Sequence, residues 1–453
     1  MNARRSLWLG LLVIALDRPS IPPAARPRSL EAEMNHPFPK FETDPLEDPL
    51  DALLVDVAVR VQLPPGLHAK ACGRGESVCN HIDRKGSPLE GRVLRFYPQG
   101  SMRIDATIST RGTDEEYDLD YVAELDEHHL APPDAVLDLV HQALRDYPTR
   151  RAVVRQTRCV TVFFADGMHV DVTPSALLPH GAERESHIFH ANPEKPANEH
   201  SHVPMNAYGF GDWYNDRTPV ERRFADAVNR RIYEAAGTEI RADAQFDEVP
   251  DQVPLIVKSV TTVALQLIKR HRNVVYAGET GRIPPSVMLS CIAGEVSSPG
   301  LPLSDMVIRL ARAIARKLMA ASARREKVSV VNPIFPNDQF TDRWPENRRQ
   351  QDDYAAKLTE LADGLEYIKR HGSSLEDTQD WLRDRFGSHV VASSIRRFNE
   401  RTGRAVQSGE HAYTSRGRLY VPSRPALIGL GGATAAATAP ARAVAHTFRG
   451  GRR

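Results

Sequence analysis

Two carboxylates, two positions apart and preceded by a turn of small residues, constrain this chain more than any other feature. Residues 96–103 read FYPQGSMR and contain Gly100 and Ser101. Residues 117–122 read YDLDYV and contain Asp118 and Asp120. Side chains alternate between the faces of a strand, so a strand here projects both carboxylates from one face. Carboxylates that close repel each other unless a cation lies between them, and their oxygens suit Mg2+ or Mn2+.

A third carboxylate, Asp171, is expected to complete this site. Residues 160–172 read VTVFFADGMHVDV, which predicts a hairpin with Asp166 and Gly167 in its tight turn. Asp171 then sits on a strand that can lie beside the first, whereas Asp166 is a turn residue and is not counted as a ligand. We therefore predict that Asp118, Asp120 and Asp171 are catalytic and hold two Mg2+ or Mn2+ ions for in-line transfer of a nucleotidyl group.

The Gly-Ser turn is interpreted as a phosphate-binding element. Gly100 allows the backbone to approach a phosphate, and Ser101 can donate its N–H and its hydroxyl to phosphate oxygens. An isolated Gly-Ser pair is usually only a turn. Its position ahead of paired aspartates favours the phosphate interpretation.

Charge and cysteine content exclude two classes of protein. The chain has 453 residues, a formal net charge of +1 and 26% charged residues, so it is not a polycation that binds nucleic acid indiscriminately. Its four cysteines are too few for a disulfide framework and fit a reducing compartment. We expect a cytoplasmic globular enzyme. The apolar run from Leu7 to Leu16 resembles a secretory signal, but Asp17 and a proline-rich stretch follow it, and residues 1–33 are interpreted as an upstream extension or disordered leader.

Apolar periodicity predicts a small sheet followed by helices. Strands are expected at roughly 92–97, 117–125, 158–164 and 168–173. Helices are expected at 51–61, 66–84, 134–147, along the apolar stripe from 257 to 268, and at 285–294, 302–322, 352–371 and 375–386. The first two helices are expected to brace the sheet. Residues 180–219, rich in His, Asn, Pro and Gly, are expected to form a long functional loop or a poorly ordered one.

These patterns predict four segments. Residues 1–33 form the leader, 34–250 a nucleotidyltransferase catalytic domain, 251–405 a helical domain, and 406–453 a C-terminal segment with a flexible tail. The Gly-, Ala- and Thr-rich composition from about Gly429 is typical of a tail.

Several blocks in a fixed order carry a family resemblance. They are PQGSMR, YDLDYV, VDVTP, NAYGF with the following Trp213 and Tyr214, LQLIKRHR, PSVM and VNP. From roughly Asp51 to Trp344, the chain resembles the bacterial cGAS/DncV-like nucleotidyltransferases of the polymerase beta superfamily.

The resemblance implies an α+β fold and a synthase. The expected architecture is a polymerase-beta-like core with a small mixed sheet and an oligoadenylate-synthase-like helical domain, bilobed with a central cleft. The implied activity joins nucleoside triphosphates into a cyclic di- or trinucleotide messenger in anti-phage signalling. Lys269 and Ser286 are implied to lie near the triphosphate. A lysine near a helix end is otherwise solvated or paired with the last carbonyls, and a serine is otherwise a cap.

Other polar and aromatic groups keep two interpretations. Tyr208, Trp213 and Tyr214 either stack on a base or belong to the core. Two groups have a zinc-like density without a standard spacing, so a buried thiol or a mobile polar loop is the commoner explanation. They are Cys72 and Cys79 with His68 and His81, and the set His187, His190, His200 and His202.

Two rival functions and one partner also follow from the sequence. The same chemistry would serve transfer to RNA or protein or synthesis of linear oligomers, and a catalytically inactive nucleotide or nucleic-acid sensor is the rival of another class. Arg449-Gly450-Gly451 resembles the glycine ends that ubiquitin-transfer-like enzymes recognise, so such an operon-encoded enzyme, or an operon-encoded activator, is a hypothetical partner. No membrane partner is expected.

Overall fold

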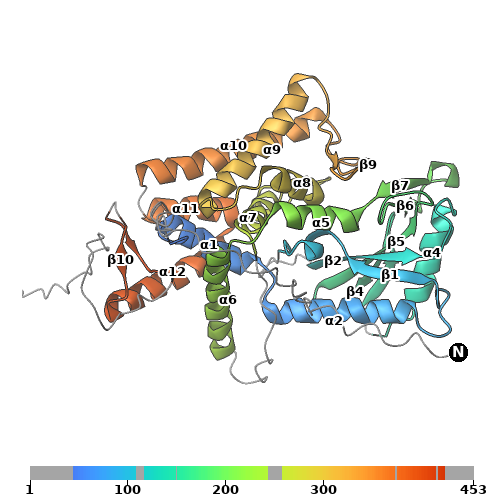
Figure 1. Ribbon diagram of the computed structural model, residues 1–453, viewed down its shortest axis with the longest axis horizontal. Coiled ribbons are helices and arrows are strands. Elements are labelled where there is room, and N and C mark those ends of the chain that lie inside the picture. Colours follow the sequence, from blue (N-terminus) through green and yellow to red (C-terminus); the bar gives the residue numbers. More distant parts are fainter. Residues whose placement is uncertain are drawn as a thin grey trace, which may run out of the picture. The chain divides into compact units, whose positions relative to one another are not determined.

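The computed structural model describes residues 44–108, 117–148, 150–242, 258–372, 375–414 and 417–423 (Figure 1). Its strands are β1 Val93–Pro98, β2 Tyr117–Leu125, β3 Ala152–Arg155, β4 Val160–Phe163, β5 Met168–Leu177, β6 Ser186–His190, β7 Ser201–Met205, β8 Val331–Asn332, β9 Phe335–Gln339, β10 Ala412–Tyr413 and β11 Leu419–Tyr420. Its helices are α1 Pro49–Val61, α2 Pro65–Ile82, α3 Gly100–Arg103, α4 Pro133–Leu144, α5 Ala207–Arg217, α6 Arg222–Ala242, α7 Val260–Val275, α8 Ser286–Val296, α9 Leu303–Ala323, α10 Arg348–His371, α11 Leu375–Phe386, α12 Ser388–Ser408 and the short 3-10 helix Ala197–Glu199.

A mixed sheet forms the core of the first half of the chain. Its strands run in the order β1-β2-β5-β4-β3, and β6 and β7 extend it from β5. β2 and β5 are parallel, whereas the other neighbours are antiparallel. Helices α2 and α4 cover one face, on which Leu119, Val170 and Val172 are fully buried (Figure 1). Strand alternation sends Asp120 and Asp171 to the opposite face.

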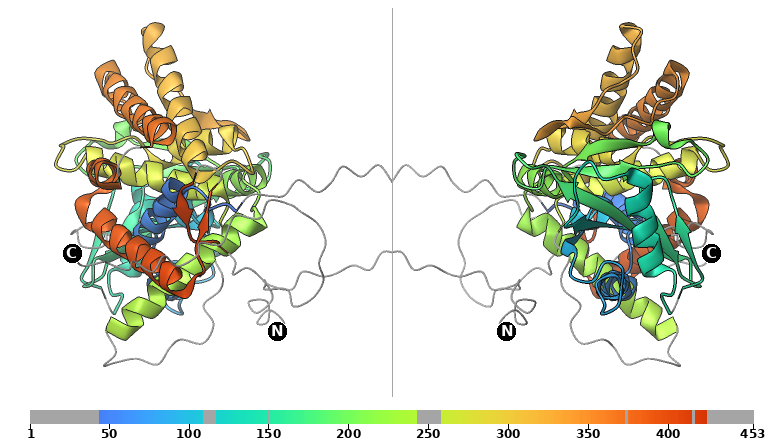
Figure 2. Two further views of the ribbon diagram at one scale, coloured as in Figure 1. Left: turned by 90° about the vertical axis from the view of Figure 1, so that its left-hand side faces the viewer. Right: turned by 90° about the vertical axis from the view of Figure 1, so that its right-hand side faces the viewer.

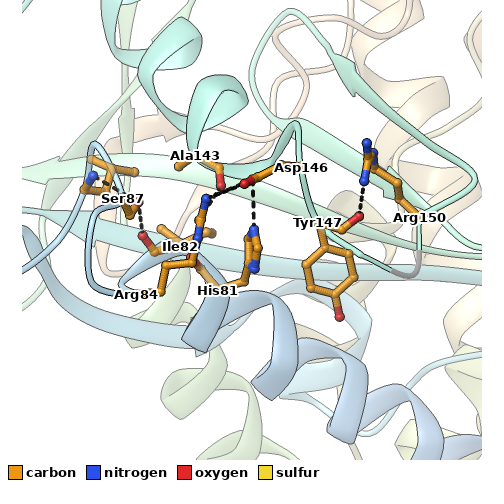
Figure 3. A network of polar contacts seen from close by, with 9 residues as sticks. His81, Ile82, Arg84, Ser87, Ala143, Asp146, Tyr147 and Arg150 are labelled. Carbon is orange, nitrogen blue, oxygen red and sulfur yellow. Dashed lines mark hydrogen bonds and ion pairs between the residues drawn. The ribbon is translucent and has the colours of Figure 1, made fainter.

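A polar network fixes the ends of the two covering helices (Figure 3). The Arg84 guanidinium, just beyond α2, donates to both carboxylate oxygens of Asp146, at 2.8 and 2.9 Å, and to the carbonyl of Ala143 in α4. The His81 ring lies 3.1 Å from Asp146 Oδ1, and this hydrogen bond holds the pKa of Asp146 below its usual range. These hydrogen bonds connect the C-terminal ends of α2 and α4, the two helices that cover this face of the sheet.

Four predicted strands are present as β1, β2, β4 and β5, and β4 and β5 form the predicted hairpin. Gly167 in its turn has φ +82°, the left-handed conformation that the Asp-Gly pair predicts. Strand β3, an edge strand of only four residues, is not predicted.

The expectation of a long loop at 180–219 is wrong. The segment forms the β6–β7 hairpin and then α5, and the Asn206 side chain caps this helix by accepting from Gly209 N at 2.9 Å. The histidines obscure the strand period because histidine counts as a polar residue in the alternation, yet the rings of His187 and His202 pack with their centroids 5.7 Å apart. An imidazole can serve as either a polar or a packing group.

The second hydrophobic cluster lies among the helices, and α1 belongs to it. The prediction that α1 braces the sheet is wrong: Leu53, Leu54 and Val57 are buried in this cluster, and α1 contacts α6, α7, α9 and α12 (Figures 1 and 2). Every residue of α1 from Leu50 to Ala58 is buried, which indicates a central helix enclosed on all sides. Only α2 of the two N-terminal helices covers the sheet.

The predicted C-terminal helices are present as α7, α8, α9, α10 and α11, whereas α6 and α12 are not predicted. The expected division at residue 250 falls between the described ranges. The predicted leader and the tail from Gly429, including Arg449-Gly450-Gly451, also lie outside the described residues. These domain limits stay predictions. Within the described part of the chain, no helix has both the length and the apolar character needed to cross a bilayer.

Candidate active site

Asp120 and Asp171 are direct neighbours across two parallel strands. Their Cα atoms are paired in the β2–β5 register, and Thr161 of β4 is paired with Asp171 on its other side. Paired residues in parallel strands project from the same face, so the two carboxylates share one site. Asp118 is paired with His169 through its backbone, but its side chain lies outside the described part of the structure.

The Gly-Ser turn reaches this pair of carboxylates. The backbone N–H of Gln99 donates to the carbonyl of Asp120 at 2.9 Å, which holds the turn against β2. Gly100 has φ +56°, and a β-carbon built on it would lie 2.9 Å from Oδ2 of Asp120. Residue 100 therefore has both a conformational and a steric reason to be glycine.

Lys269 joins the same site from α7. Its Nζ donates to Ser101 Oγ at 2.6 Å and to the carbonyl of Ala106 at 2.8 Å, and the residue is only 3% exposed. Burial and these two bonds exclude a solvated lysine and a lysine that caps the last carbonyls of its own helix. The structure thus places Gly100, Ser101 and Lys269 together beside Asp120.

Ser286 lies at the first turn of α8, which contacts α3. Its hydroxyl accepts from Nη1 of Arg272 at 2.9 Å, and the same nitrogen donates to the carbonyl of Pro284 at 2.8 Å. The N-cap of α8 is Pro285, and no side chain caps this helix. The alternative that Ser286 serves as a cap is therefore not realised.

The three aromatic candidates have different surroundings. Tyr214 is fully buried, with its hydroxyl 3.2 Å from Thr262 Oγ1, and belongs to the core. Trp213 is half-buried and stacks on Phe210 with ring centroids 5.6 Å apart. Tyr208 is half-buried, and the Arg103 guanidinium lies 4.6 Å from its ring centroid. Stacking on a nucleotide base therefore stays a prediction for Tyr208 and Trp213, and not for Tyr214.

The zinc-like groups do not converge. Among the side chains that the structure describes, no three His, Cys, Asp or Glu residues are placed to hold a metal ion. His81 is hydrogen-bonded to Asp146, and the second histidine group splits, because His187 lies beside His202 whereas His190 accepts from Arg158 Nε at 2.9 Å.

Asp120 and Asp171 fit a divalent cation of the magnesium type. Their adjacent carboxylates offer the hard oxygen donors that Mg2+ and Mn2+ prefer, and the close approach of Gly100 brings the Gly-Ser turn to the same place. The carboxylate oxygens, the Ser101 hydroxyl and the Lys269 ammonium therefore lie in one region.

Residues 94–174 match the family described as cyclic GMP-AMP synthase DncV-like, nucleotidyltransferase domain. This range runs from β1 through β5 and includes Gly100 and all three predicted aspartates. The cyclic dinucleotide synthase CdnG of Bradyrhizobium diazoefficiens is 55% identical over 410 residues, which cover 90% of this chain and 97% of the relative. The chain belongs to the DncV-like nucleotidyltransferase family. It is therefore an enzyme that transfers nucleotidyl groups, and the predicted resemblance is confirmed.

Other comparisons agree with this assignment. A solved structure of B. diazoefficiens CD-NTase CdnG in complex with GTP is 54% identical, with a TM-score of 0.70 over 79% of this chain and all of that chain. A c-di-GMP synthase of Roseivirga ehrenbergii is 21% identical over 305 residues, which cover 66% of this chain and 73% of the relative. The α+β fold with a polymerase-beta-like core is confirmed for this nucleotidyltransferase.

The sequence does not single out Arg272, which the structure places against Ser286. It follows Lys269 by three residues, so the two share one face of α7. That i, i+3 spacing was visible in the sequence, but only the structure shows that the guanidinium reaches Ser286 rather than solvent.

Proposed function

We propose that this enzyme joins nucleoside triphosphates, GTP among them, into a cyclic di- or trinucleotide and releases pyrophosphate. The observation that carries the proposal is the pairing of Asp120 with Asp171 beside Gly100. The 55% identity with a cyclic dinucleotide synthase, and the GTP bound by the related CdnG, support the choice of product and substrate.

Asp118, Asp120 and Asp171 would hold two Mg2+ or Mn2+ ions. Bound there, the cations supply positive charge that polarises the α-phosphate and neutralises the departing pyrophosphate. Ser101 and Lys269 bind the triphosphate, and Gly100 lets the backbone N–H groups approach it. Lys269 is only 3% exposed, and low exposure to water strengthens the contact of its ammonium group with a phosphate.

The chemical step needs little covalent work by the protein. A ribose hydroxyl attacks the α-phosphorus in line, a new oxygen–phosphorus bond forms, and the bond to the bridging oxygen of pyrophosphate breaks. Asp171 accepts the proton of the attacking hydroxyl. Fixed orientation supplies much of the rate increase. Each further bond forms in the same way, and the ring closes when the free ribose hydroxyl of the linear intermediate attacks the α-phosphorus of its own remaining triphosphate.

We further propose that the product is a messenger in anti-phage defence and that the enzyme acts in the cytoplasm, where its nucleotide substrates are made. In the proposed organisation, residues 34–250 form the catalytic domain and 251–405 the helical domain. The links between Lys269 of α7 and the Ser101 turn support a site built by both.

The test is an assay of purified enzyme with all four nucleoside triphosphates and Mg2+ or Mn2+. Mass spectrometry should find a small product that phosphatase leaves intact, with one pyrophosphate released for each phosphodiester bond in it. A phosphatase-sensitive product would indicate linear oligomers, and label on RNA or protein would indicate a different acceptor. No pyrophosphate, even with operon partners added, would favour the inactive sensor.

A further inference from the structure

Two positively charged side chains on one face of α7 donate hydrogen bonds to two serine hydroxyls. Lys269 and Arg272 are three residues apart and both are buried. Lys269 Nζ donates to Ser101 Oγ at 2.6 Å, and Arg272 Nη1 donates to Ser286 Oγ at 2.9 Å. The two serines come from different elements, since Ser101 lies in α3 and Ser286 begins α8.

The direction of these hydrogen bonds orients the hydroxyl protons. Ammonium and guanidinium groups only donate, so both serine oxygens must accept and both protons must point elsewhere. Within the described residues, neither Ser101 nor Ser286 donates its hydroxyl to another residue. Each hydroxyl is thus a polarised donor whose proton is available to a ligand rich in acceptors.

The two serines are linked through α7, because Lys269 and Arg272 are three residues apart on this helix, and α3 and α8 also contact each other. Arg272 also donates to the carbonyl of Pro284, which fixes the chain just before α8. Its other donors reach Asn273 Oδ1 at 2.9 and 3.1 Å, so the guanidinium is held in one orientation. A ligand that meets both serines needs acceptor oxygens on more than one centre, as a polyphosphate has.

We propose that Arg272 is a positioning residue for the triphosphate of the substrate. Through Ser286 and Pro284, it holds the Ser286 hydroxyl as a donor to a phosphate oxygen next to those bound by Ser101 and Lys269. The identity of the ligand, a nucleoside triphosphate, rests on the proposed function. The new element is Arg272, which acts on the ligand through Ser286.

The test is a double-mutant cycle on nucleotide affinity, measured by calorimetry with Ca2+ in place of Mg2+. Arg272→Met and Ser286→Ala should each raise the Kd for GTP about tenfold, because a hydrogen bond to a charged group is lost. The Kd for GMP should not change. The double variant should bind GTP no more weakly than either single variant, since Arg272 acts through Ser286.

Two further variants separate positioning from folding. Ser286→Thr keeps the hydroxyl and should retain affinity for GTP. Ser290→Ala is the matched control, because this serine lies one turn along α8 and donates its hydroxyl to the carbonyl of Ser286 at 2.9 Å; its Kd for GTP should equal that of the wild type. If Arg272→Met does not fold, Arg272→Lys replaces it: the lysine keeps the charge but not the planar guanidinium, and it should weaken GTP binding in the wild-type background and not in Ser286→Ala.

Additive losses, an equal loss for GMP, or wild-type affinity in Ser286→Ala would overturn the inference. If the enzyme makes a cyclic product but Ser286→Ala leaves the Kd for GTP unchanged, the inference about Arg272 is overturned and the proposed function stands. GTP binding with the expected coupling but no cyclic product would overturn the proposed function and leave Arg272 in its role. A wild-type enzyme that binds no triphosphate would overturn both.

Discussion

Gly100 approaches Asp120 so closely that a β-carbon would lie 2.9 Å from Oδ2 of the carboxylate. The same residue has φ +56°, so alanine there is disfavoured twice. The contact links the Gly-Ser turn directly to the carboxylate pair, so a shift of the turn should also move Asp120.

Gly100→Ala should therefore lower kcat/KM for pyrophosphate release roughly a hundredfold, because misplaced reacting groups lose that much. Gly91→Ala is its control. Gly91 has φ +70° with nothing within 4 Å of a built β-carbon, so alanine should cost about 1 kcal/mol of stability and no activity. Equal activity losses in the two variants would contradict this explanation.

Asp171→Asn should reduce kcat roughly 10²- to 10³-fold with little change in melting temperature, because a charge aimed at the reacting centre is removed. Initial rates of pyrophosphate release measure this. The matched control is Asp166→Asn in the adjoining turn, where the carboxylate pairs with Lys70 and Arg74 at 2.6 and 2.8 Å. That change should cost at most about 1 kcal/mol and spare turnover.

His271 should make the protein less stable in mild acid. Burial lowers its pKa from 6.5 to about 4, so the unfolded chain binds more protons between these values and stability falls as the pH drops through this window. The loss amounts to roughly 3 kcal/mol. His271→Asn keeps a donor for the carbonyl of Arg385 and should flatten the acid limb of urea unfolding. An unchanged limb would refute this assignment.

Arg401→Met should cost about 3 kcal/mol of stability, because it leaves the buried Asp56 carboxylate without its bidentate partner. The guanidinium of α12 donates to both oxygens of this α1 residue, at 2.8 and 2.9 Å. Combining Arg401→Met with Asp56→Leu should recover part of the loss in urea unfolding. A double variant that is less stable than Arg401→Met would show that the pair contributes more than the desolvation it costs.

Local patterns predicted the strands and the hairpin turn that position Asp120 and Asp171, because such features are local. The Gly-Ser turn, the Asp-x-Asp strand and the Asp-Gly hairpin each act over a few residues, where strand alternation and turn chemistry decide the geometry. The sequence did not predict the β6–β7 hairpin, because histidine fits both polar and packed surroundings. It did not predict the packing of α1 either, because an apolar helix does not specify which of two hydrophobic cores it will join.

The amino-acid sequence is sufficient to identify two aspartates two positions apart on a strand, a Gly-Ser turn ahead of them, and a family order of blocks. The folded chain alone shows that Asp120 lies beside Asp171 in register, that Lys269 is buried against Ser101, and that Arg272 reaches Ser286. These contacts join residues far apart in the chain. They depend on how the sheet and helices pack, which local propensity does not encode.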